Sequence, residues 1–218
     1  VRIESTGGSG NRIQGNKIYS NTGLGINLVG GTENSFGVTA NDTGDGDSGA
    51  NGLQNFAVIQ SAMISGTDLL LNATLNSIAS RTFRVEVFAS SLADASGYGE
   101  GQRYLGTFNT TTNGSGNASI GTVLNGVTVA AGEKVTVTAT DLTTNNTSEF
   151  SYAVMATLLA GSAPSTIQVT KTSRGGIRLN EDGGNDVVLV ANQTPFSGQT
   201  AVTIEVSFSV TTPSTGMT

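Results

Sequence analysis

The sequence predicts an all-β protein, on three observations. Apolar and polar residues alternate over short stretches, as in residues 84–88 and 134–139, which is the period of a half-buried strand. No stretch shows a convincing run of apolar residues at the spacing of a helix. Only 12% of the 218 residues are charged, about half the usual share, and glycine, serine, threonine and asparagine are abundant, which is typical of β architectures with many turns.

Residues 1–37 predict the terminal coil or coils of a parallel β-helix. Aliphatic residues stand among glycines and asparagines, which tolerate the left-handed backbone of tight corners; they are Ile13, Ile18, Ile26 and Leu28. Asparagines recur every five residues, at Asn11, Asn16 and Asn21, and are expected to form a ladder along the helix axis. A solenoid coil cannot bury its apolar face alone. We therefore expect these coils to be completed by an upstream segment or by another molecule.

Residues 38–55 predict an acidic, glycine-rich connector with a candidate calcium site. Asp42, Asp45 and Asp47 lie within six residues, and Ca²⁺ takes 6 to 8 oxygen ligands. The stretch lacks the glutamate that closes an EF-hand loop. The alternative is a solvated linker in which aspartate and glycine only form turns.

Residues 56–160 predict an immunoglobulin-like sandwich of seven short strands. The strands are expected at 56–64, 69–75, 83–89, 103–109, 118–124, 133–140 and 149–156. Residues 112–117 read as a hairpin turn. The predicted core consists of Val58, Leu69, Leu71, Leu75, Phe83, Val85, Val87, Leu105, Ile120, Val135, Val137 and Phe150.

Residues 160–164 predict a linker to a short C-terminal β segment at 165–218. Its strands are expected at 166–170, 176–179, 187–191 and 201–210. The last of these is apolar on one face, through Val202, Ile204, Val206, Phe208 and Val210. A strand of this kind needs a partner sheet, so we expect another chain to complete the segment through these residues.

Several motifs together resemble a family of large secreted bacterial proteins. The motifs are GNKIYSNTGLGINL at 15–28, VTANDTGDGDSGANGLQNF at 38–56, SGYGEGQ at 96–102 and NTSEF at 146–150. In that family a right-handed, pectate-lyase-like β-helix ends in an Ig-like module. The resemblance covers residues 10–152 and implies a secreted or cell-surface protein with a structural or adhesive role. It transfers no catalytic residues.

The loop at 94–102 is a candidate binding site. Tyr98 is flanked by glycines, and Glu100 and Asp94 offer carboxylates nearby. The alternative is that Tyr98 folds back on the edge of the sandwich. A second turn lies between Asp141 and Glu149. We expect the carboxylates of these two residues to accept hydrogen bonds from the backbone of the same loop.

Composition argues against several functional classes. The chain has no histidine and no cysteine, which removes Ser-His-Asp and Cys-His nucleophiles and the usual zinc sites. The net charge of −6 disfavours nucleic acid. No apolar segment is long enough to cross a membrane. A carboxylate-pair glycosidase using Asp94 and Glu100 would lack any tryptophan to line a sugar subsite.

The sequence therefore predicts a non-enzymatic, extracellular structural or adhesive protein of a bacterial cell surface. Incomplete β ends at both termini predict self-association, head-to-tail into filaments, or contact with neighbouring domains of a larger surface protein. Two alternatives remain open. One is a module that binds a glycan or another surface. The other is the C-terminal fragment of a larger carbohydrate-active β-helix protein.

Overall fold

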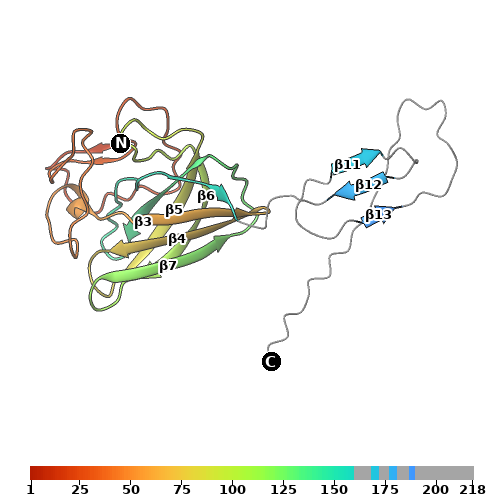
Figure 1. Ribbon diagram of the computed structural model, residues 1–218. Coiled ribbons are helices and arrows are strands. Elements are labelled where there is room, and N and C mark those ends of the chain that lie inside the picture. The colour runs from red at the N-terminus through yellow and green to blue at the C-terminus, as the bar shows by residue number, and fades with distance from the viewer. Residues whose placement is uncertain (160–167, 172–176, 181–186, 190–218) are drawn as a thin grey trace. The chain divides into compact units, whose positions relative to one another are not determined.

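The computed structural model describes residues 1–159 and the backbone of residues 168–171, 177–180 and 187–189 (Figure 1). The chain divides into two compact units, Val1–Ala163 and Pro164–Thr218. The prediction of an all-β protein is confirmed. Within the described residues the helical structure is one short 3₁₀ element, η1 (Ala50–Leu53).

The first unit contains two four-stranded sheets that face each other. Its strands are β1 (Arg2–Ile3), β2 (Asn27–Leu28), β3 (Val58–Ser65), β4 (Asp68–Asn76), β5 (Thr82–Ser90), β6 (Arg103–Thr111), β7 (Asn117–Leu124), β8 (Lys134–Asp141), β9 (Val154–Met155) and β10 (Thr157–Leu158). One sheet has the order β10-β3-β4-β7 and the other the order β6-β5-β8-β9. Neighbours are antiparallel except for β10 and β3. The first six predicted strands correspond to β3 through β8.

The seventh predicted strand, at 149–156, is too long. Only Val154–Met155 is a strand in that range. Before it, serine side chains replace part of the ladder: Val137 N–H donates to Ser151 Oγ at 3.0 Å, and Ala139 N–H donates to Ser148 Oγ at 2.9 Å. The segment therefore covers the edge of β8 without adopting regular strand geometry.

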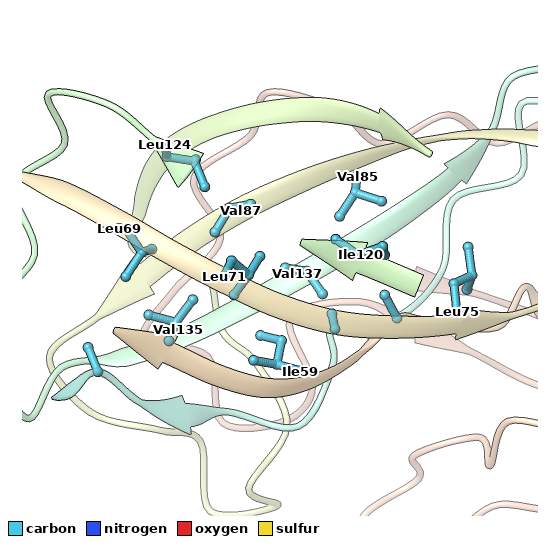
Figure 2. Packing of buried hydrophobic residues seen from close by; sticks show 14 of the residues in the cluster. Ile59, Leu69, Leu71, Leu75, Val85, Val87, Ile120, Leu124, Val135 and Val137 are labelled. Carbon is cyan, nitrogen blue, oxygen red and sulfur yellow. The ribbon is translucent and has the colours of Figure 1, made fainter. Parts of the chain in front are cut away.

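Alternating aliphatic residues from both sheets fill the space between them (Figure 2). Leu71 on β4, Val85 on β5 and Val137 on β8 are each at most 1% exposed. The predicted inward position of Val58 is wrong, because it is 47% exposed. Val58 pairs with the outward Thr74 of β4, and its neighbour Ile59 points inward instead.

Two other core predictions need adjustment. Leu105 is only half-buried against the sandwich core. Phe150 is 3% exposed but belongs to a second apolar cluster outside the two sheets.

The predicted hairpin at 112–117 is also wrong, because β6 and β7 belong to different sheets. The connection crosses from one sheet to the other beside the loop that joins β4 to β5. Ser77 N–H donates to the Gly116 carbonyl at 2.9 Å, and Ser80 N–H donates to the Asn113 carbonyl at 3.1 Å. Gly116 has φ 78° there, a backbone angle that favours glycine.

The structure shows no parallel β-helix within the described residues. Residues 1–55, called here the N-terminal layer, contain one short parallel pair, β1 with β2, and η1. The three asparagines do not stack on one another. Asn11 bonds Asn51, Asn16 bonds its own turn and Asn21 bonds Glu100.

The N-terminal layer packs instead on the outer face of the β6-β5-β8-β9 sheet. Outward residues of that sheet are buried, including Glu86 and Phe88 of β5 and Thr138 of β8. The layer supplies most of the second apolar cluster; the buried members of the cluster are Ile3, Ile26, Leu28, Ala50, Leu53, Phe88 and Phe150. Ile26 and Leu28 therefore pack in a cluster that joins residues of the N-terminal layer to Phe88 and Phe150. The central strands β5 and β8 are therefore buried on both faces over most of their length.

The second unit contains a three-stranded antiparallel sheet in the order β11 (Gln168–Lys171), β12 (Ile177–Asn180) and β13 (Val187–Leu189). These overlap three of the four predicted strands. The fourth, at 201–210 with Val202, Ile204, Val206, Phe208 and Val210, lies outside the described residues.

Candidate metal site and neighbouring pocket

The acidic loop, defined here as residues 41–47, is fixed against the sandwich by asparagine side chains. Asn55 Nδ2 donates to the Asp42 carbonyl at 2.7 Å, and Asp42 N–H donates to Asn55 Oδ1 at 3.1 Å. Asn76, at the end of β4, accepts from Gly44 N–H at 2.7 Å. The loop is therefore held between the last turn of the N-terminal layer and the first sheet.

Within this loop the three predicted metal ligands come together. The carboxylates of Asp42, Asp45 and Asp47 each offer an oxygen within 4.8 Å of the others. Oδ1 of Asp42 and Oδ1 of Asp47 are buried and accept no hydrogen bond from the described residues. A buried carboxylate oxygen without a partner is costly, because it has lost water and gained nothing in exchange.

Asp45 is the most buried member of the cluster, at 9% exposure. It accepts from Asn55 N–H at 2.9 Å, from Ser77 Oγ at 2.6 Å and from Gln54 Nε2 at 2.7 Å. Burial, helped by the negative charges of Asp42 and Asp47, raises the pKa of Asp45 to about 6, although the hydrogen bonds from Ser77 and Asn55 act in the opposite direction. Burial and then the charge of Asp42 also raise the pKa of Asp47.

The donor set fits calcium. Three carboxylates supply hard oxygen ligands, the loop is rich in carbonyls, and no lysine or arginine forms an ion pair with them among the described residues. A bound divalent cation would satisfy the two unpartnered oxygens and offset the repulsion among the three carboxylates. The side chains of Asp42, Asp45 and Asp47 are the groups that would hold it.

The three residues of the predicted binding loop, at 94–102, have different surroundings. Tyr98 folds back on the sandwich, with its ring edge-on to Phe56 at 5.6 Å and to Tyr152 at 5.3 Å between centroids. This is the arrangement that the alternative interpretation predicts. Asp94 Oδ1 accepts from Ser96 N–H at 2.8 Å, and Glu100 is buried.

Asp94 and Glu100 nevertheless line one common pocket of about 350 Å³, and Tyr98 does not. The opposite wall comes from residues 19–22 of the N-terminal layer, where Tyr19 is 49% exposed. The sequence pattern does not reveal Tyr19, because it assigns residues 1–37 to a separate β-helix. Only the packing of this layer on the sandwich brings Tyr19 opposite the loop after β5.

A third group of carboxylates holds the N-terminal layer by its backbone. Glu86 Oε2 accepts from Gly15 N–H at 2.8 Å, and Glu100 Oε1 accepts from Asn21 N–H at 3.1 Å and from its Nδ2 at 2.6 Å. Glu149 accepts from Leu28 N–H at 2.8 Å and from Thr39 N–H at 3.0 Å. These contacts span 71 to 121 residues of sequence.

Burial raises the pKa of Glu149 to about 7, although the two N–H donors act in the opposite direction. The expectation that Glu149 bonds its own turn is wrong. The expectation for Asp141 is confirmed, because its Oδ1 accepts from Thr143 N–H at 2.7 Å. Its other oxygen pairs with Arg81 at 3.3 Å.

Comparison with known proteins identifies no family. No family model and no curated protein matches the chain. The crystal structure of FlgD from Xanthomonas campestris is similar over 63% of this chain and 91% of that chain. That structure concerns the hook capping essential for flagellar assembly. The two are 19% identical with a TM-score of 0.27, and a similarity at that level supports no inference about fold or function. In the described part of the chain no helix is long and apolar enough to span a membrane.

Proposed function

We propose that this chain is a non-enzymatic, extracellular structural module of a bacterial surface protein, stabilised by a calcium ion in the acidic loop. The observation that carries the proposal is the cluster of Asp42, Asp45 and Asp47, with two buried oxygens that have no partner among the described residues. Without a cation this cluster is destabilising, because its negative charges repel one another and two buried oxygens have no partner among the described residues. With a bound cation the same oxygens are its ligands.

The position of the loop suggests what calcium would do. The acidic loop contacts Asn55, where the N-terminal layer ends, and Asn76 and Ser77, where β4 ends. A cation at the loop would stiffen the junction between the layer and the two sheets. Calcium sites of extracellular modules have dissociation constants of about 10⁻⁴ to 10⁻³ M, so the junction would respond to the calcium of the surroundings.

The absence of histidine and cysteine from the sequence supports a role without catalysis, since histidine is the commonest general acid–base and both residues belong to common nucleophilic arrangements. The proposal includes assembly with copies or neighbouring domains. The alternating segment at 201–210 supports that part of it by pattern alone.

The first test is thermal unfolding of the full chain with and without calcium. With a dissociation constant in the range above, 5 mM Ca²⁺ is about 5 to 50 times that constant and stabilises the folded state by about 1 to 2 kcal/mol. For a chain of this size that raises Tm by roughly 2 to 8 °C. Magnesium at the same concentration is expected to do less, because it demands a smaller octahedral site.

Asp47→Asn is the informative variant, because Asp47 Oδ1 accepts no hydrogen bond from the described residues and its charge can be removed without breaking one there. Asp68→Asn, outside the acidic loop, is the matched control. The calcium-dependent rise in Tm should vanish in the first variant and persist in the second. Identical melting with and without calcium in the wild-type chain would refute the calcium site.

A further inference from the structure

A polar pocket lies between the N-terminal layer and the loop that follows β5. It encloses about 350 Å³, which is within the usual range for small-molecule sites. One wall is formed by residues 19–22 and the other by residues 90–95, with Glu100 and Gln102 between them. Both walls belong to the same compact unit.

The chemistry of the lining excludes two classes of ligand. Hydroxyl, amide and carboxylate side chains predominate, and no lysine or arginine lines the pocket, so a phosphate or another anion finds no counter-charge. An aliphatic ligand would bury many polar groups without partners. Tyr19 and Leu92, which are 49% and 79% exposed, supply apolar surface beside these polar groups.

Two of the polar groups are already fixed in place. Gln102 Oε1 accepts from Ser91 N–H at 3.2 Å and from Ser91 Oγ at 3.3 Å, and Gln102 Nε2 remains as a donor within the described residues. Asp94 Oδ1 accepts from Ser96 N–H at 2.8 Å, and among the same residues Asp94 Oδ2 remains as an acceptor. Fixed side chains lose little conformational entropy when a ligand binds.

We propose that this pocket binds a neutral saccharide. Sugar hydroxyls can donate to Asp94 and accept from Gln102, while the carbon-bound hydrogens of the ring pack against Tyr19. An amphipathic ligand of this kind matches a site with one aromatic ring and many hydrogen-bonding groups. The inference goes beyond the proposed structural role and does not depend on calcium.

Tyr19→Ala and Asp94→Asn are the test variants. The first removes the exposed ring, and the second retains the acceptor for Ser96 while replacing the free acceptor with a donor. Phe36→Ala is the control, because Phe36 is 55% exposed and does not line the pocket. Far-UV circular dichroism confirms that each variant is folded.

The probe is an array of neutral oligosaccharides incubated with the full chain, followed by calorimetry with any saccharide that is retained. We expect binding that weakens about tenfold in Tyr19→Ala and in Asp94→Asn, which is about 1.4 kcal/mol, and that is unchanged in Phe36→Ala. Competition by the methyl glycoside of the terminal sugar distinguishes recognition of a single sugar from recognition of a longer glycan. Failure to retain any neutral saccharide, binding restricted to charged sugars, or equal binding by Tyr19→Ala would overturn the proposal.

Discussion

Replacing Glu149 with glutamine isolates the effect of a buried carboxylate whose pKa is strongly raised. Glu149 is 3% exposed and bonds the backbone of the N-terminal layer at Leu28 and Thr39. Glutamine keeps the size of the side chain and one acceptor, but it does not ionise. If the difference in the free energy of unfolding between the wild type and the variant changes with pH, that change therefore reports the ionisation of Glu149.

The sign and size of the effect follow from the pKa. Burial raises the pKa of Glu149 from 4.5 to about 7. A raised pKa means that the protonated form is favoured by folding, so its contribution is fully present below pH 4.5 and is lost as the pH rises through 7. At about 1.4 kcal/mol for each pKa unit, the stability of the wild type relative to the variant should fall by roughly 2 to 3 kcal/mol between about pH 5 and about pH 8.

Urea unfolding in calcium-free buffer measures this difference. The chain has four tyrosines and no tryptophan, so tyrosine fluorescence and far-UV circular dichroism are the signals. Because the pKa of Asp45 is raised in both proteins, its contribution cancels in the comparison. In Glu4→Gln, an exposed control, the stability relative to the wild type should change little with pH. A stability difference between the wild type and Glu149→Gln that is the same at both pH values would refute the reasoning.

Three further predictions concern packing, backbone and calcium. Phe150→Ala should lower the free energy of unfolding by about 3 to 5 kcal/mol in urea titrations, because Phe150 joins the N-terminal layer to Phe88 of the sandwich; a loss below about 1 kcal/mol would contradict this. Gly116→Ala should cost more than about 1 kcal/mol, because φ is 78° and a Cβ would collide with the carbonyl of the neighbouring loop, whereas Gly114→Ala meets nothing and should be neutral by the same titration. Calcium affinity by calorimetry should be at least about tenfold weaker at pH 5 than at pH 7.5, because protons compete at Asp45, whose pKa is raised to about 6; equal affinities would count against carboxylate ligation.

The strands of the sandwich were predictable because their signal is local. In β5, Val85 and Val87 alternate with Arg84 and Glu86, so the period of two shows in the sequence itself. The prediction of which residues point inward failed at Val58, because that depends on the register between β3 and β4. Nothing in the sequence around Val58 says that it pairs with an outward residue of β4.

The structure does not show the β-helix predicted for residues 1–37, and the reason is related. Aliphatic residues among glycines and asparagines indicate corners and buried side chains, and both are present at Ile26 and Leu28. The cluster that buries them, however, includes Phe88 and Phe150, which lie far away in the sequence. A local pattern can show that a residue is buried but not which surface buries it, so a coil stacked on other coils and a layer packed on a sheet look alike.

The candidate sites divide in the same way. The acidic cluster was predictable because Asp42, Asp45 and Asp47 are neighbours in the sequence. The pocket was only half predictable, since Asp94 lies in a glycine-rich loop but Tyr19 comes from a different layer. The role of Glu149 could not be predicted, because its two donors lie 121 and 110 residues away.

Titration of Ca²⁺ into the calcium-free full chain by calorimetry at pH 7.5 tests the central claim most directly. The proposed function predicts one site in the acidic loop, with a dissociation constant of about 10⁻⁴ to 10⁻³ M. Affinity should be lost in Asp47→Asn and kept in Asp68→Asn. The absence of binding heat in the wild type, or an unchanged affinity in Asp47→Asn, would contradict the account.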